Sequence, residues 1–79
     1  MNQRYRLFID AAEFEDSQLG LGTDLSLINV AARAKMPLEE AHQHASRMTR
    51  EGLAFPIPKR PDHLKLDYDA IKFSRRQGA

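Results

Sequence analysis

The sequence contains no cysteine. Disulfides, thiolate zinc sites and thiol catalysis are therefore excluded. Its apolar runs are far shorter than the roughly 20 residues that a membrane-crossing helix needs. No apolar segment follows the opening Met1-Asn2-Gln3-Arg4, so we expect no export signal. These absences together predict a cytoplasmic protein with no membrane partner.

The length of 79 residues predicts one compact domain, residues 1–79. Hydrophobic residues make up 42% and charged residues 29% of the chain, which is typical of a globular protein. A domain of this size buries only about 60% of its unfolded surface, so a small core is expected. We place the central part of the domain at residues 23–68 and expect residues 75–79 to be frayed.

Charge is divided unevenly along the chain. Residues 1–24 carry two arginines against five acidic residues, a net charge of −3. From Leu25 onward, ten lysines and arginines face six acidic residues, a net charge of +4. Such a division can create one positive face. The equally weighted alternative is that these side chains are ordinary solvent-exposed charges without a common face.

The first block of sequence, residues 1–22, allows two interpretations. Tyr5, Leu7 and Ile9 alternate with polar residues as in a half-buried strand, after which Asp10 and Glu13 would cap a short helix. The alternative is one helix from about Gln3 to Leu19, ended by the glycines at 20 and 22. We favour the single helix.

The second block, residues 23–53, predicts two consecutive helices. Ser26 can cap the first, which must end near Met36 because Pro37 disfavours helical geometry before it. Pro37 also suits the opening of the second helix, residues 38–50, which Gly52 ends. The predicted inward faces of the two helices are formed by Leu27, Val30, Ala31 and Ala34 and by Leu38, Ala41, Ala45 and Met48.

The third block predicts a β-hairpin and a last short helix. Residues 53–58 and 64–68 form the two extended stretches around a basic tip, and the prolines suit an exposed edge. Asp69 then caps a helix that contains Ala70, Ile71 and Phe73.

The segment from Leu25 to Leu53 resembles the helix-turn-helix core of bacterial winged-helix regulators. Matching positions are Val30-Ala31, Met36, Ala41, Met48 and Gly52-Leu53. Two positions depart from that pattern: Lys35 stands where the family often has glycine, and Pro37 stands where a Ser or Thr cap is common. The resemblance implies a mainly α fold with a small β-hairpin, the winged helix-turn-helix, and a partner that is double-stranded DNA.

In such a fold the helix over residues 38–50 is implied to enter the major groove. Gln43 and Arg47 are the candidates for adenine and guanine edges, and Ser46 and Arg50 for phosphates. The hairpin is implied to contact the backbone or minor groove through Lys59, Arg60 and Lys65, with His63 as a weaker candidate. Glu39 and His42 are further candidates for DNA contact on the same outward side of the helix, which also carries Glu40.

Each of these assignments has an alternative. Arg47 can pair with Glu51, and Arg50 can be a simple helix-end charge. Glu39 and Glu40 repel phosphate, unless Glu39 accepts from a cytosine amino group, and they can equally be solvated acids.

Other chemistries have little support. His42 and His44 are two residues apart and do not share a helix face, so no metal or other cofactor is expected. No apolar pocket is implied around Glu13, Glu15 or Asp16, so we predict no catalytic residues and no enzyme. The aromatic residues Phe55, Tyr68 and Phe73 can stack on single-stranded bases, but we expect them to pack in the core.

The sequence therefore predicts a small transcriptional regulator of bacterial or phage type, acting as a homodimer. Two alternatives stay open. One is a phage or mobile-element architectural factor, such as an excisionase or replication accessory, that bends DNA. The other is a winged-helix module that docks on a protein partner.

Overall fold

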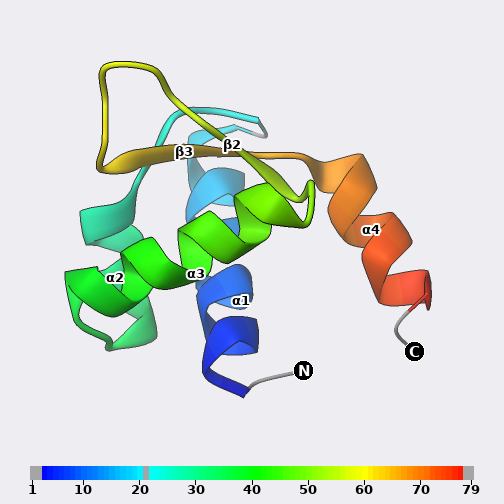
Figure 1. The fold of residues 1–79 in the computed structure, drawn as a ribbon, viewed down its shortest axis with the longest axis horizontal. Coiled ribbons are helices and arrows are strands. Elements are labelled where there is room, and N and C mark those ends of the chain that lie inside the picture. Colours follow the sequence, from blue (N-terminus) through cyan, green and yellow to red (C-terminus); the bar gives the residue numbers. More distant parts are fainter. Residues whose placement is uncertain (1–2, 21, 78–79) are drawn as a thin grey trace.

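The computed structural model describes residues 3–20 and 22–77. Within these ranges the chain forms four helices and three short strands (Figure 1). The predicted mainly helical fold with a small β-hairpin is confirmed at this level. In chain order the elements are α1 (Gln3–Leu19), β1 (Leu25–Ser26), α2 (Leu27–Ala34), α3 (Leu38–Arg50), β2 (Ala54–Pro56), β3 (His63–Leu66) and α4 (Tyr68–Gln77).

The first block is one helix, as we favoured. α1 ends at Leu19 because Gly20 follows with a φ of +92°, in the left-handed region. Asp16, in the last turn, is fully buried, and its carboxylate accepts from the backbone N–H groups of Gly22 and Thr23 at 2.9 and 3.0 Å. This carboxylate holds the chain as it turns from α1 toward the sheet. The buried side chains recur at one side of the helix: Tyr5, Phe8, Ile9 and Ala12.

Residues 35–37 join α2 to α3 in a tight turn. Lys35 adopts the left-handed conformation, with φ of 56° and ψ of 50°. The N–H groups of Lys35 and Met36 donate to the carbonyls of Ala32 and Ala31, at 3.2 and 3.0 Å, and so close the end of α2. Pro37 is extended and directly precedes α3. The turn thus takes the geometry that a glycine favours with a lysine in its place.

A short strand that was not predicted from the sequence precedes α2. Leu25 and Ser26 form β1, which is too short to produce an alternating pattern. The predicted side-chain cap by Ser26 is wrong, since its hydroxyl makes no capping hydrogen bond. The first turn of α2 is instead tied to the hairpin, because the N–H of Leu27 donates to the carbonyl of Asp62 at 2.8 Å.

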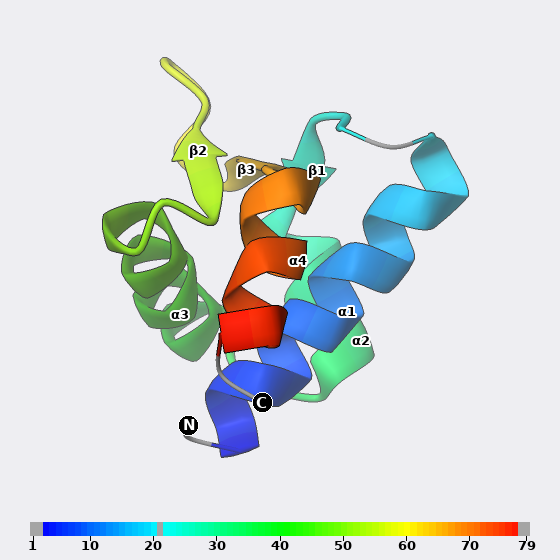
Figure 2. The same ribbon diagram turned by 90° about the vertical axis from the view of Figure 1, so that its right-hand side faces the viewer.

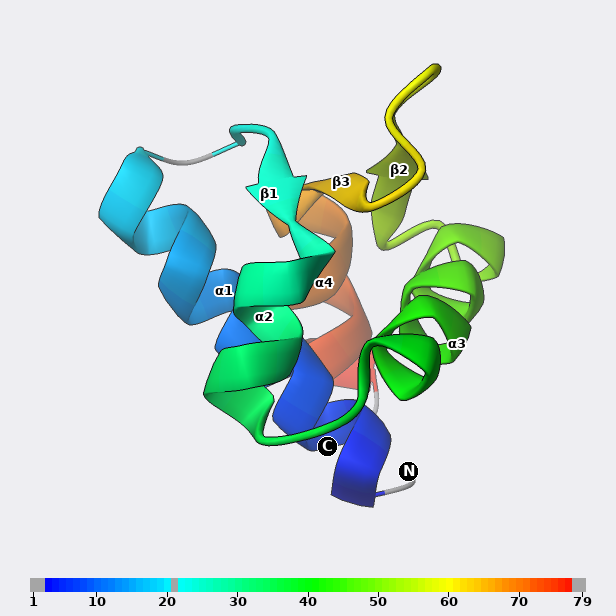
Figure 3. The ribbon, with the colours of Figure 1, turned by 90° about the vertical axis from the view of Figure 1, so that its left-hand side faces the viewer.

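The sheet has the strand order β1-β3-β2 and is antiparallel throughout. The β2–β3 hairpin was predicted, although its strands are shorter than the predicted stretches. Leu25 pairs with Leu64, and Phe55 pairs with Lys65. Pro56 lies on β2, an edge strand, as expected for a residue without an N–H. The helices lie below or beside the sheet, and in the described chain none crosses its outer face (Figures 1 and 3).

The last helix differs from its prediction at both ends. α4 begins at Tyr68, and the side chain of Asp67 caps it by accepting from the N–H of Ala70 at 3.0 Å. Asp69 therefore lies inside the helix instead of capping it. Arg75 and Arg76 are helical, since α4 continues to Gln77, so the frayed end predicted from residue 75 is wrong for these positions. Residues 78 and 79 lie outside the described part of the chain.

A single buried cluster takes side chains from all of these elements. Ile71 joins it from α4, which Figure 2 shows in front of α1 and α2. Two aromatic residues that we expected in the core are outside it, since Phe55 is 51% and Phe73 is 64% exposed. Tyr68 is partly buried against the cluster, as expected. Among the described residues, no helix is both long and apolar enough to cross a membrane.

Candidate nucleic-acid interface

One side of α3 carries an uninterrupted row of solvent-exposed side chains. The inward side is the one predicted, with Ala41, Ala45 and Met48 buried. The exposed positions follow at intervals of four, three and four residues, which places them on one face of a helix. α3 lies at the outer edge of the molecule, so nothing in the described chain covers this face (Figures 2 and 3). We name the row formed by Glu39, Gln43, Ser46 and Arg50 the α3 row.

Arg47 lies beside the α3 row and is engaged with α1. Its guanidinium carbon lies 4.1 Å from the centre of the Tyr5 ring, and its Nε donates to Glu51 Oε2 at 3.2 Å. The Tyr5 hydroxyl also donates to Glu51, at 2.6 Å. Burial and this hydrogen bond raise the pKa of Tyr5, and the same bond lowers the pKa of Glu51. The alternative partner that the sequence offered for Arg47 is therefore the observed one.

The two acidic residues that open α3 have different surroundings. Glu39 belongs to the exposed row. Glu40, expected to face outward, turns back to α1, where Arg4 donates to both of its oxygens at 2.8 Å. His44 lies on its other side at 3.0 Å. The hydrogen bond from Arg4 and then that from His44 lower the pKa of Glu40 to about 2. Only one of the two carboxylates is left facing outward.

The hairpin is tied to the body of the protein through histidine and arginine. Asp24, just before β1, lies 2.5 Å from Arg60 Nη1 and 2.5 Å from His63 Nδ1. On the other side, Asp62 lies 2.7 Å from Nε2 of His42 on α3. These contacts use three of the predicted DNA-binding side chains, and they fix the direction of the hairpin relative to α3.

Three of the predicted cations have no such contact. Lys59 and Lys65 on the hairpin and Arg50 on α3 are exposed, and none makes an ion pair with another described residue. Lys59 stands at the hairpin tip with a φ of 68°. These three cations, together with Glu39, Gln43 and Ser46, are the predicted site residues whose polar groups remain open to a ligand.

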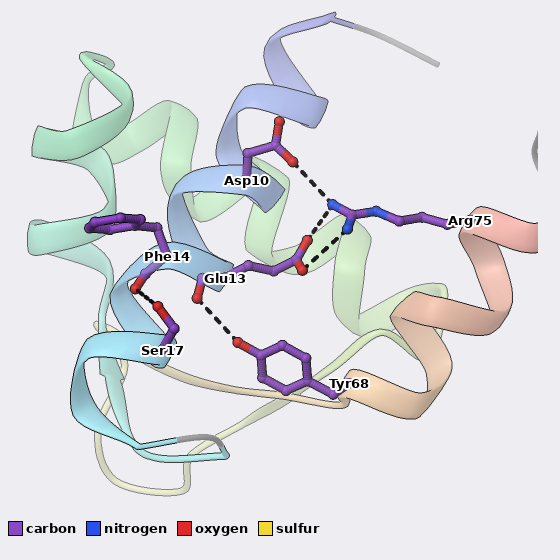
Figure 4. A pocket seen from close by; sticks show the side chains of 6 residues that line it. All are labelled: Asp10, Glu13, Phe14, Ser17, Tyr68 and Arg75. Carbon is purple, nitrogen blue, oxygen red and sulfur yellow. Dashed lines mark hydrogen bonds and ion pairs between the residues drawn. The ribbon is translucent and has the colours of Figure 1, made fainter.

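A hollow of about 370 Å³ lies between α1 and α4 (Figure 4). The guanidinium of Arg75 lies between Asp10, at 3.1 Å, and Glu13. The Tyr68 hydroxyl donates to the backbone carbonyl of Glu13 at 3.1 Å, and burial raises the pKa of Tyr68 to about 12. Burial also raises the pKa of Glu13. These polar groups bind one another and hold α4 against α1.

The carboxylates considered for hydrolysis are likewise occupied. Glu15 lies 3.4 Å from Arg33, and Asp16 accepts from three groups of the turn that follows α1. His42 and His44 contact different carboxylates, and the described residues contain no group of three side chains suited to a metal ion. Of the three carboxylates considered for hydrolysis, Glu13 lines the hollow between α1 and α4, where it pairs with Arg75.

The role of Asp24 was not predicted from the sequence. It was counted only as part of the acidic first block, because its partners lie 36 and 39 residues further along the chain. No spacing rule connects residues at such distances. The exposure of Phe55 was missed for a related reason, since a short strand does not reveal which of its faces is covered.

Comparison with known proteins identifies no relative: no family model, no curated protein and no solved structure matches the chain.

Proposed function

We propose that this protein is a winged helix-turn-helix protein that binds double-stranded DNA, with α3 in the major groove and the β2–β3 hairpin as the wing. The observation that carries the proposal is the α3 row. Its four side chains extend along the whole helix, and the opposite side of α3 is packed into the core. A helix held in this way can enter the groove without losing any contact that stabilises the fold.

The residues of the row have chemistry suited to a duplex. Gln43, near the middle of α3, has an amide that can bond an adenine edge through paired hydrogen bonds. Arg50, at the end of the helix, and Ser46 are suited to phosphate oxygens. The carboxylate of Glu39 repels the phosphates of the DNA backbone. Its favourable partner on DNA is the amino group of a cytosine, from which it can accept a hydrogen bond.

The hairpin adds positive charge to the contacts proposed for α3. Lys59 and Lys65 are exposed and available for phosphates. Because Asp62 and His42 join the hairpin to α3, the two proposed contact regions have a fixed relative position. Arg47 is given a different role from the one expected from sequence: it supports α3 against Tyr5, and base contact falls to Gln43.

We propose a regulator as the biological role, with two copies on a two-fold site, since one small module buries limited surface on DNA. The test is an NMR titration of isotope-labelled protein with a random-sequence duplex at two salt concentrations. Shifts are expected on the α3 row and at residues 59–65, and they are expected to fade as salt rises.

Matched variants sharpen this test. Arg50→Ala is expected to reduce the salt dependence of binding by about one phosphate contact, a change of roughly 1 in the slope of log K against log salt. Lys72→Ala removes one exposed charge from α4 and is expected to leave the slope unchanged. Equal effects of the two variants, or no shifts on α3 at low salt, would refute the proposal.

Docking on a protein partner has one observation in its favour. A hollow of about 580 Å³ between α1 and α2 is lined in part by Leu7 and Phe14, which are 44% and 47% exposed. Exposed apolar residues close together are typical of protein contacts. Absence of DNA-induced shifts in the titration would favour this second function.

A further inference from the structure

The outer face of the hairpin carries an exposed aromatic residue beside a lysine. Phe55 on β2 is directly opposite Lys65 on β3, and both side chains are exposed. Their neighbours Ala54, Leu64 and Leu66 are buried, so Phe55 and Lys65 point away from the core. Cross-strand neighbours on one face lie about 4.5–5.5 Å apart at Cβ, so the ring and the ammonium group act on one small area of surface.

Phe55 contributes little to the core, because half of its surface faces solvent. No helix of the described chain crosses this face of the sheet (Figures 1 and 3). A protein strand added to the edge of β2 is a poor explanation, since Pro56 on that edge has no N–H to donate. The ring is therefore available to a ligand that approaches the face of the hairpin.

The charges around Phe55 indicate which ligand. Lys59 and Lys65 on the hairpin are exposed and unpaired within the described residues, and the one acid of the tip, Asp62, binds His42. β2 also contacts α3, the helix that carries the proposed groove contacts. Proteins that kink DNA from the minor groove insert an apolar side chain between base steps and hold the backbone with nearby cations, and Phe55 with Lys59 and Lys65 supplies both kinds of group.

We propose that Phe55 inserts at a base step of the minor groove while Lys65 binds the adjoining phosphate, and that the protein thereby bends the duplex. This inference rests on the proposed function and adds an activity to it. The wedge has a fixed direction, because Asp24 and His42 hold the hairpin from two sides. Because the hairpin cannot rotate away from the duplex, insertion of Phe55 is expected to kink the DNA axis. Inserted apolar side chains kink DNA by about 20–90°.

The experiment uses a duplex of about 30 base pairs with donor and acceptor dyes at its ends and 2-aminopurine beside a central TpA step, which is easily kinked. Wild-type protein is expected to raise energy transfer between the ends and the fluorescence of 2-aminopurine. Phe55→Ala is expected to lose at least half of both signals and to retain binding, measured by anisotropy, within about tenfold of wild type.

Two further variants separate the wedge from general effects. Phe55→Leu keeps an apolar side chain and is expected to retain part of the bend. Phe73→Ala removes an aromatic residue that is 64% exposed on α4, and it is expected to change neither signal. Thermal melting of each variant checks that the fold is kept.

The outcomes distinguish the two proposals. Salt-dependent binding without any bend, or a bend that Phe55→Ala leaves unchanged, overturns the wedge and leaves the proposed function in place. No binding to the duplex at low salt overturns both. Equal losses of bending in Phe55→Ala and Phe73→Ala also overturn the assignment to the hairpin.

Discussion

The guanidinium of Arg47 lies over the ring of Tyr5, 4.1 Å from its centre, and so joins α3 to α1. Arg47→Ala removes this contact and the exposed ion pair with Glu51. A cation–π contact contributes about 0.5–1 kcal/mol and an exposed ion pair about 0.2–1 kcal/mol. We therefore expect a loss of about 1 kcal/mol in the free energy of unfolding, measured in urea.

Arg50→Ala is the control for that experiment, because Arg50 lies on the same helix without an ion pair to a described residue. It is expected to stay within about 0.5 kcal/mol of wild type in stability and to weaken DNA binding more than Arg47→Ala does. If the two variants show the reverse order in binding, the α3 row is misassigned.

Under the proposed function, Asp24 would compete with DNA phosphates for two hairpin side chains, Arg60 and His63. Asp24→Ala releases Arg60 and His63 from a carboxylate that lies 2.5 Å from each. We expect affinity for duplex DNA to rise roughly 3- to 10-fold, with a salt slope steeper by about 1, because the guanidinium of Arg60 can then neutralise a phosphate. Anisotropy titrations over a series of salt concentrations measure both quantities.

Asp69→Ala removes the same charge from an exposed position on α4, and it shows how much of the effect comes from net charge alone. Weaker binding by Asp24→Ala would mean that the carboxylate acts mainly by positioning the hairpin.

Lys35 occupies a left-handed backbone conformation, which costs a residue with a Cβ about 1–2 kcal/mol. Glycine removes this cost but loses about 0.5–1 kcal/mol of its own through greater freedom in the unfolded chain. Lys35→Gly is therefore expected to stabilise the protein by up to about 1 kcal/mol.

Lys72→Gly is the matched change inside α4 and is expected to destabilise by about 0.5–1 kcal/mol. Thermal melting of both variants tests the pair. A lower melting temperature for Lys35→Gly would contradict the assigned turn geometry.

Glu40 links acid stability to the contact between α1 and α3. Its pKa is lowered from 4.5 to about 2, so the stability it contributes is complete above pH 4.5 and is lost as pH falls toward 2. Urea unfolding across this range is expected to show a steeper decline for wild type than for Glu40→Gln. Glu39→Gln, on the exposed row, is expected to follow wild type, and parallel curves for all three proteins would count against the Arg4–Glu40 contact.

The helices could be predicted from sequence because their signals are local. The inward positions of α3 recur at helical spacing, and Gly20 and Gly52 mark the ends that the structure has. β1 was not predictable, since two residues carry no period, and its existence depends on pairing with β3 almost 40 residues away. α4 begins at Tyr68, earlier than predicted, because the side chain of Asp67, and not that of Asp69, accepts from the N–H of Ala70 in the first turn.

The candidate site was predictable only in part. Helical periodicity predicted seven outward positions on α3. The structure exposes four of them, Glu39, Gln43, Ser46 and Arg50, and half-buries Glu40, His42 and Arg47. The partners of Arg47, Arg60 and His63 could not be predicted in the same way, because which acid a long side chain reaches depends on the folded chain path. Tyr5 is the clearest case: it is 42 residues from Arg47 in sequence and in contact with it in space.

The hairpin is anchored at two points outside itself, to Asp24 on one side and to His42 on the other. Its shape is thus set when the chain folds. A flexible loop would lose conformational entropy when it binds a partner. This hairpin loses that entropy when the chain folds, so the loss does not weaken binding. Association should then proceed as docking of a preformed surface, at a rate governed by diffusion and electrostatic attraction instead of by a search among loop conformations.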